Sequence, residues 1–246
     1  MRASARLSFQ SLCVMPAQSL TISVSSGTLS ALQQSGFHLY AFRPVTSSNK
    51  SGVPLVWGRI DTYLETIPLT FTSEALCAYI STDAIAVDAA ITMGASIAVS
   101  VSGQVVSVAA GGGLTVASGA PTGDIYIASA ASASYTCGLA AELGGASAQP
   151  FCAFALFPQV AVTMQPVDAI FVMWATSIFD PAVYMQQSLG PGLLVGFGSA
   201  AQRAVSYDIA AGWQAGGASW AQPVASGADL AATLILDPGH NHPVMR

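Results

Sequence analysis

The stretch 89–123 limits the fold more than any other part of the chain, because it contains no charged side chain. Inside it, apolar residues alternate with Ala and Ser up to Gly103-Gln104, and a second apolar run follows this break. The apolar positions are Ile97, Val99, Val101, Val105, Val106 and Val108. Alternation of period two predicts a strand with one apolar face, and a short glycine-containing break between two such runs predicts a β-hairpin. We therefore expect a hairpin that lacks the charges which usually protect an exposed edge.

Similar short runs recur along the chain and are separated by Gly, Pro, Ser and Asn residues. They predict strands at 18–25, 37–42, 55–57, 66–72, 75–81, 114–117, 124–128, 151–157, 169–175, 193–197, 204–209 and 231–236. The runs 151–157 and 169–175 are densely apolar, which is typical of central strands covered on both faces. The pattern favours an all-β fold, an antiparallel β-sandwich or barrel of about a dozen short strands.

One or two short helices are expected between these strands. In residues 27–35, Leu29 and Leu32 are at helical spacing, and Gly36 can end the helix. Residues 181–187 are the second candidate for a short helix.

The chain is expected to comprise an N-terminal arm, residues 1–17, and a β-sandwich region, residues 18–246. A change from aromatic-rich sequence to Ala, Ser and Val indicates a soft boundary between two sub-domains near 82–95. The arm contains no convincing signal peptide, because its apolar stretch 7–15 is interrupted by polar residues. No run reaches the ~18 apolar residues of a transmembrane helix, and no compartment is predicted.

Charged residues make up 8% of the sequence, whereas about 25% is typical of soluble domains. Either Ser, Thr, Gln and Gly cover the surface, or much of it is buried against lipid or other subunits. The seven Lys and Arg residues are scattered, and the net charge is −5. Because nucleic-acid binding needs clustered positive charge, we expect no nucleic-acid partner.

The four cysteines, Cys13, Cys77, Cys137 and Cys152, are too far apart in sequence for a metal-binding knuckle. Cys137 and Cys152 flank a Gly-Gly turn, so a disulfide between neighbouring strands is one interpretation. The other interpretation, which we favour, is that all four are buried free thiols.

No motif for catalysis or cofactor binding forms a complete site. Gly196 and Gly198 are spaced as in a dinucleotide site, but a strand-like run follows where a helix is required. Asp237, His240 and His242 form the most metal-like cluster, but the surrounding Pro and Gly residues indicate a terminal loop, and no metal is predicted. No G-x-S-x-G motif is present. We therefore predict no catalytic residue, no cofactor and no enzymatic activity.

Trp213 and Trp220 lie among glycines and are candidates for a recognition face, because tryptophan is frequent in binding hot spots. The alternative is that both rings belong to the core.

Three hypotheses about function remain. The favoured one is a non-catalytic β protein of shell, fibre or inclusion type that packs against copies of itself through uncharged surfaces, because interface cores are depleted of charge. The second is a protein that inserts the hairpin around 97–108 into membranes. The third is a module that binds a carbohydrate or another ligand through Trp213 and Trp220. The expected partner is therefore a second copy, with a membrane or a glycan as alternatives.

Overall fold

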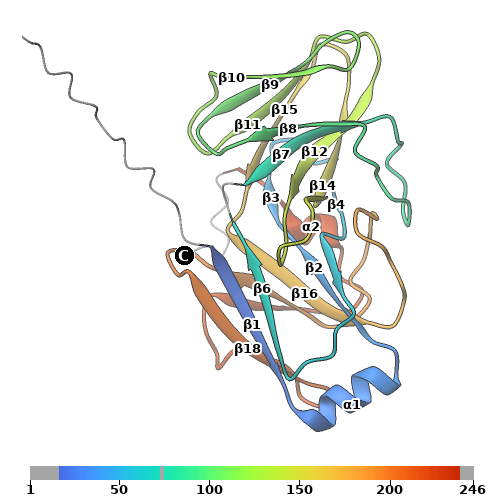
Figure 1. The fold of residues 1–246 in the computed structure, drawn as a ribbon, viewed down its shortest axis with the longest axis vertical. Helices are drawn as coiled ribbons and strands as arrows, with labels where there is room; N and C mark the ends of the chain where they lie inside the picture. Colours follow the sequence, from blue (N-terminus) through green and yellow to red (C-terminus); the bar gives the residue numbers. More distant parts are fainter. Residues whose placement is uncertain (1–16, 73–74, 239–246) are drawn as a thin grey trace, which may run out of the picture.

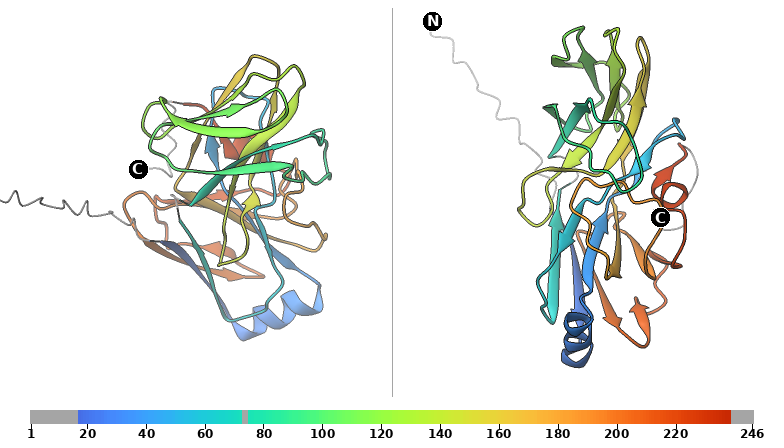
Figure 2. Two further views of the ribbon diagram at one scale, coloured as in Figure 1. Left: turned by 45° about the horizontal axis from the view of Figure 1, so that its top comes forward. Right: turned by 90° about the vertical axis from the view of Figure 1, so that its right-hand side faces the viewer.

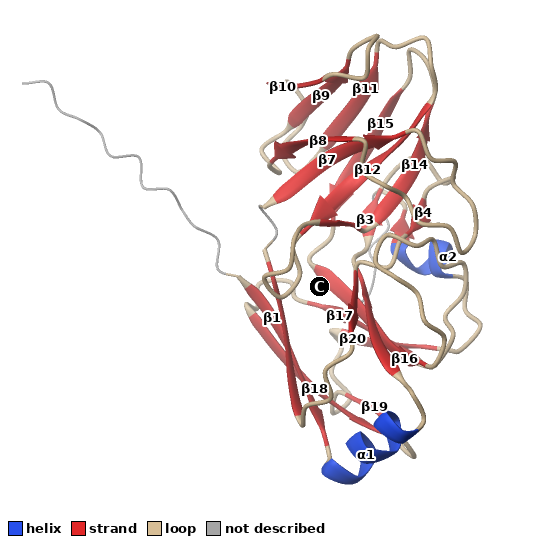
Figure 3. Cartoon of the chain, turned by 45° about the vertical axis from the view of Figure 1, so that its right-hand side comes forward, coloured by secondary structure: helices blue, strands red, loops and turns tan. Residues whose placement is uncertain are grey.

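The computed structural model describes residues 17–72 and 75–238 (Figure 1). These residues form twenty-one strands, fifteen of them with four or more residues, and two short helices. The strands make four open sheets in which most neighbours are antiparallel. The predicted all-β fold is therefore confirmed, in its sandwich form, and strands run along the whole body of the molecule (Figure 3).

Two sheets form what we call the lower sandwich, at the bottom of Figure 1. The first has the order β19 (Gly212–Gln214), β18 (Gln202–Asp208), β1 (Gln18–Val24) and β6 (Thr66–Phe71). The second has the order β20 (Ala221–Val224), β17 (Gly192–Gly196), β16 (Ala169–Ala175), β2 (His38–Phe42) and β5 (Gly58–Ile60). Alternation places Leu20 and Ile22 of β1 inside, where they share a core with Trp174 of β16.

Two further sheets form the upper sandwich. One has the order β10 (Leu114–Ser118), β9 (Gln104–Val108), β11 (Ile125–Ser129), β15 (Ala161–Pro166), β3 (Val45–Thr46) and β21 (Ile235–Leu236). The other has the order β4 (Val53–Pro54), β14 (Cys152–Leu156), β12 (Tyr135–Ala141), β7 (Leu76–Ser81) and β8 (Ala95–Val99), with β13 (Gln149–Pro150) also paired to β12. The right-hand view of Figure 2 shows the two sandwiches one above the other.

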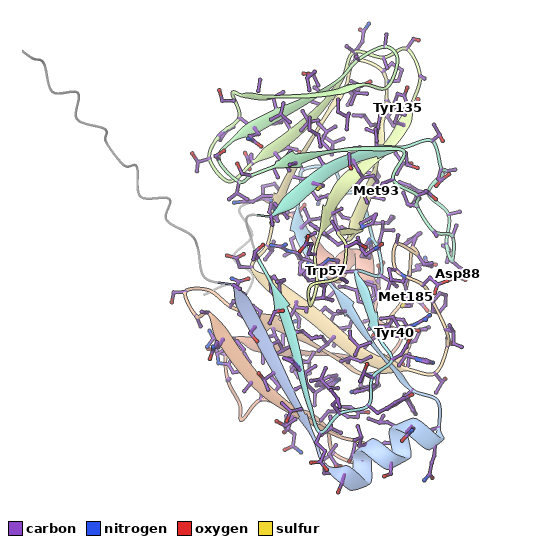
Figure 4. All side chains as sticks on the ribbon, viewed as in Figure 1. Tyr40, Trp57, Asp88, Met93, Tyr135 and Met185 are labelled. Carbon is purple, nitrogen blue, oxygen red and sulfur yellow. The ribbon has the colours of Figure 1, made fainter. Side chains whose placement is uncertain are left out.

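One continuous apolar core extends through both sandwiches, from Leu20 in β1 to Ile127 in β11. Trp57 is fully buried and lies near the middle of the long axis (Figure 4). The stretch 82–95 joins β7 and β8, which are paired neighbours in one sheet. A division into two sub-domains remains a prediction.

The prediction for 169–175 is confirmed, because all seven residues of β16 are buried. Ile170, Val172 and Trp174 face the lower sandwich core. The alternate residues Phe171 and Met173 belong to a second cluster, which also contains residues of helix α2 (Leu230–Leu234). Strand β16 is therefore covered on both faces. The opposite sheet of the lower sandwich covers one face, and elements that include α2 cover the other.

The first predicted helix is confirmed as α1 (Ser26–Gln34). Ser25 caps its N-terminus by accepting a hydrogen bond from Thr28 N at 3.3 Å. Leu32 is buried, and Gly36 adopts a φ of 67°, as expected after a helix end.

Three helix and strand assignments are wrong. Residues 55–57 form no strand; Leu55 makes an isolated β-bridge, and neither Val56 nor Trp57 belongs to a strand. Residues 181–187 form no helix; Ala182 has a φ of 70°, and Val183, Tyr184 and Gln187 make isolated β-bridges. Residues 231–236 begin as helix α2 rather than as a strand, because the Asp229 side chain caps Ala231 N at 2.8 Å.

The hairpin predicted around 97–108 is also wrong. β8 pairs with β7, whereas β9 pairs with β10 and β11 in the opposite sheet. The break at Gly103, with φ 83°, carries the chain between sheets, and its carbonyl accepts hydrogen bonds from Gly119 N and Ala120 N. A Cβ atom at Gly103 would collide with the Ala120 carbonyl oxygen, so only glycine fits there. The hairpin of this region is β9–β10 instead.

Candidate functional site

The apolar side chains predicted as an assembly or membrane surface mostly face the interior. Val99, Val106 and Val108 are buried in the main core, and Ile97 and Val101 pack against it while partly buried. The sixth residue of this set, Val105, is partly buried. The three buried side chains therefore cannot contact a partner unless the sandwich opens, and the backbone edge of the region is its most accessible feature.

That edge consists of β8 and β10, which each end a sheet of the upper sandwich and lie side by side. We call this pair the uncharged edge. Both strands lie within the charge-free stretch 89–123. Among the described residues, no backbone hydrogen bond outside their own ladders involves residues 95–99 or 114–118. Each strand therefore presents a free row of donors and acceptors.

The register identifies the free groups of β10. Ala109 N donates to Gly113 O at 2.9 Å, and Thr115 lies opposite Ser107. Because hydrogen-bonded pairs alternate along an antiparallel ladder, the backbone groups of Thr115 and Ala117 bond to β9. Those of Val116, between them, point away from the sheet.

The other strands that end a sheet in the described chain are protected or very short. Proline, which cannot donate to a ladder, or a charged residue blocks pairing at such edges. Protection of this kind comes from Pro54 in β4, Pro68 in β6, Pro150 in β13, Pro223 in β20 and Arg59 in β5, while β19 and β21 have three and two residues. The uncharged edge therefore differs from the remaining edges in having no such protection.

The two candidate tryptophans lie in different surroundings. Trp213 lies in β19 and lines a groove of about 480 Å³ with Leu193, Ala215, Ala221 and Pro223. Both rings are partly buried and pack against the main core, but the Arg203 guanidinium lies 4.7 Å from the centre of the Trp220 ring. The structure therefore leaves Trp213 as the better candidate for contact with a ligand.

A second groove, of about 400 Å³, lies beside β5. Its walls combine apolar and polar side chains: Trp57, Ile60, Leu64, Leu143 and Pro181 with Arg59, Asp61, Thr62, Ser147 and Gln149.

Four ionisable groups meet next to this second groove, although no sequence pattern indicates that they belong together. His38 Nδ1 lies 2.7 Å from Asp61 Oδ1, and Arg59 Nε donates to Asp61 Oδ2 at 3.0 Å. Arg59 Nη1 also donates to Asp180 Oδ1 at 3.0 Å. Partial burial opposes the charged guanidinium, but the hydrogen bond and negative charge of Asp61, with Asp180, raise the pKa of Arg59. The cluster joins β2, β5 and the loop after β16.

A histidine held by a carboxylate is two thirds of a catalytic triad. Among the described residues, no serine or cysteine side chain is hydrogen-bonded to His38. The cluster can offer polar contacts to a ligand in the groove.

Within the described residues, the remaining candidates form no site. Within residues 17–72 and 75–238, no group of three or more His, Cys, Asp or Glu side chains is placed to hold a metal ion. Asp237 Oδ2 lies 3.1 Å from Lys50 Nζ, whereas His240 and His242 lie outside the described residues. Strand β18 follows Gly198 where a dinucleotide site needs a helix, in agreement with the sequence analysis.

The three cysteines that the structure describes are free thiols, as predicted, but the prediction that they are buried is wrong for Cys77, which is only partly buried. Cys137 and Cys152 are fully buried, and burial raises the pKa of both thiols, that of Cys152 to about 12. Such thiols behave as small apolar side chains. Cys13 lies outside the described residues.

Comparison with protein-family models, with curated proteins and with solved structures found no match to this chain. Neither of the described helices is long and apolar enough to cross a membrane.

Proposed function

We propose that this protein is a non-catalytic β-sandwich that assembles with copies of itself through the uncharged edge. The observation that carries the proposal is the contrast between β8 and β10, which are free of Pro and charge, and the protected or very short edges elsewhere in the described chain. A free edge of this kind is a template for strand addition.

A second copy is the occupant that the charge distribution favours. Each copy carries a net charge of −5, so two copies repel each other over most orientations. Contact through the charge-free stretch 89–123 would bring no like charges directly together. A two-fold axis would pair β10 with the β10 of the partner in antiparallel fashion. Two-fold symmetry is the commonest symmetry of homodimers.

The pairing energy is moderate. A five-residue strand adds on the order of five backbone hydrogen bonds, each contributing about 0.5–1.5 kcal/mol net. Because β8 lies beside β10, the same approach can bring both sheets of the upper sandwich against the partner. Membrane insertion has less support, because the 97–108 hairpin on which it depended is absent.

The test is the mass of the purified protein by light scattering over a range of concentrations. We expect a species with a multiple of the 25.0 kDa chain mass. Replacing Thr115 and Ala117, both exposed on β10, with lysine should shift the protein to single chains because like charges meet at the interface.

Ser107→Lys is the matched control, because Ser107 is exposed on β9, directly opposite Thr115 and one strand further from the edge. It should leave the assembly intact. A single chain at every concentration, or an assembly that survives the Thr115→Lys/Ala117→Lys change, would overturn the proposal.

A further inference from the structure

The groove beside Trp213 has the composition of a binding site for an uncharged ligand. It lies where β19 and β20 end the two sheets of the lower sandwich, and its volume is about 480 Å³. No charged residue lines it. The lining consists of Leu193, Trp213, Gln214, Ala215, Gly216, Gly217, Ala218, Ala221 and Pro223. A groove of this size is within the range of small-molecule sites, which are largely apolar with a few polar groups.

The Trp213 ring is fixed before any ligand arrives. Its Nε1 donates to Pro191 O at 3.0 Å, and the centre of the Tyr207 ring lies 4.9 Å away. Tyr207 in turn packs at 5.9 Å against Trp174, which is 2% exposed. This row of rings connects the groove to the core, so a ligand that stacks on Trp213 need not immobilise it.

Polar groups lie beside the ring. Gln214 is exposed and contributes an amide that both donates and accepts hydrogen bonds. Gly216 and Gly217 have φ values of 63° and 73°, and they expose backbone without a side chain in front of it. The groove therefore combines one flat apolar surface with neutral donors and acceptors.

We propose that this groove binds a neutral carbohydrate, with a sugar ring stacked on Trp213. A pyranose has an apolar face of C–H groups and a rim of hydroxyl groups, which matches the indole ring, the Gln214 amide and the glycine backbone. A fully apolar ligand would leave those polar groups unpaired, and a charged one would find no counter-charge in the lining. The site is separate from the uncharged edge and does not depend on assembly.

Trp220 is excluded from the site by its own contacts. Arg203 covers one face of its ring and donates to Gly196 O at 3.2 Å and to Phe197 O at 3.1 Å. Trp220 also does not line the groove. It therefore serves as the matched control for Trp213.

The experiment is a titration of the full chain with neutral hexasaccharides built from β-1,4-glucose, α-1,4-glucose, β-1,4-mannose or β-1,4-N-acetylglucosamine. Calorimetry gives the affinity. Because Trp57 and Trp174 are buried, a change in tryptophan emission indicates Trp213 or Trp220, and a change that persists in Trp220→Ala indicates Trp213. We expect at least one probe to bind and to change the emission. Trp213→Ala should weaken that binding at least tenfold, whereas Trp220→Ala should change it less than twofold.

Ala218→Glu is a second variant, because it places a carboxylate in the groove and keeps Trp213. It should also weaken binding at least tenfold, and thermal unfolding of each variant verifies that it is folded. An acidic hexamer of galacturonic acid should not bind. The proposal is overturned if none of the neutral probes binds, if only the acidic one does, or if a folded Trp213→Ala or Ala218→Glu protein binds as tightly as the original. Light scattering of the same samples tests assembly independently.

Discussion

Arg43 is a buried cation whose replacement by methionine should stabilise the protein. It is 1% exposed, and its guanidinium lies 5.4–5.6 Å from the ring centres of Trp57, Phe71 and Phe151. Nη1 donates to Thr72 O at 3.2 Å. Within the described chain, Nε and Nη2 have no hydrogen-bond partner. Unpaired buried donors and a desolvated charge both cost folding free energy.

The size of this folding cost follows from the shift in the pKa of Arg43. Burial lowers the pKa of Arg43 from its ordinary value to about 10, although the negative charge of Asp168 acts in the opposite direction. The difference corresponds to about 3 kcal/mol against the charged form. Because the folded pKa lies below the unfolded one, this destabilisation is fully present at neutral pH and is relieved only as the pH rises through about 10.

Arg43→Met removes the charge and keeps an unbranched side chain against the three rings, where sulfur contacts are favourable. Part of the gain is offset by the lost cation–π contacts, each worth about 0.5–2 kcal/mol, and by the lost bond to Thr72. We expect the free energy of unfolding at pH 7 to rise by about 1–3 kcal/mol, measured by urea denaturation.

Two controls separate the charge from the packing. Arg43→Ala should lower stability by about 2–4 kcal/mol, because it removes the charge but leaves a cavity. Arg203→Met should not stabilise, since the Arg203 guanidinium has two carbonyl partners. A fall in stability of more than 1 kcal/mol for Arg43→Met would refute the reasoning and show that the three rings outweigh desolvation.

Three further predictions follow from local features. Ala182 has a φ of 70°, so Ala182→Gly should raise the unfolding free energy, measured in urea, by roughly 0.5–1 kcal/mol. A lower unfolding free energy would contradict the inference that the Ala182 backbone is strained. Cys137 and Cys152 should react with a thiol reagent at pH 8 only after unfolding, and rapid labelling of both in the native protein would be inconsistent with their raised pKa values. Hydrogen bonds from Ala211 N, the Thr28 hydroxyl and Ala210 N lower the pKa of Asp208, so its stabilisation is present above the ordinary carboxyl pKa and is lost as the pH falls through the folded value. The thermal stability of Asp208→Asn should therefore fall less between pH 5 and about pH 2.5 than that of the original protein.

The sequence predicted individual strands well because their signal is local. Alternation in 18–25 and the apolar run 169–175 each specify a strand, and both form nearly as expected. Pairing is not local. Val99 lies opposite Leu76, and Gln104 lies opposite Ile125, so the two runs in 97–108 joined different sheets without any change in their own pattern.

The candidate sites were less predictable for the same reason. His38, Asp61 and Asp180 are far apart in the sequence and are brought together by β2, β5 and the loop after β16. Nothing in the residues near Arg43 indicated a cation enclosed by rings from three segments. Trp213 and Trp220 were candidates because they lie among glycines, but only the structure distinguishes them, since Trp213 lines a groove and Arg203 packs on Trp220.

The low charge content of this chain is related to the way its edge strands are protected. A protein with few Lys and Glu residues must prevent unwanted strand pairing by other means, and here proline protects β4, β6, β13 and β20. If the absence of charge merely reflected a surface rich in Ser and Ala, longer edges without proline would be expected at several places. Among the strands that end a sheet in the described chain, those with four or more residues and neither proline nor charge are β8 and β10, which lie side by side. Protection of the other terminal strands favours pairing at this place, and two-fold pairing there would give a closed dimer rather than an open-ended aggregate.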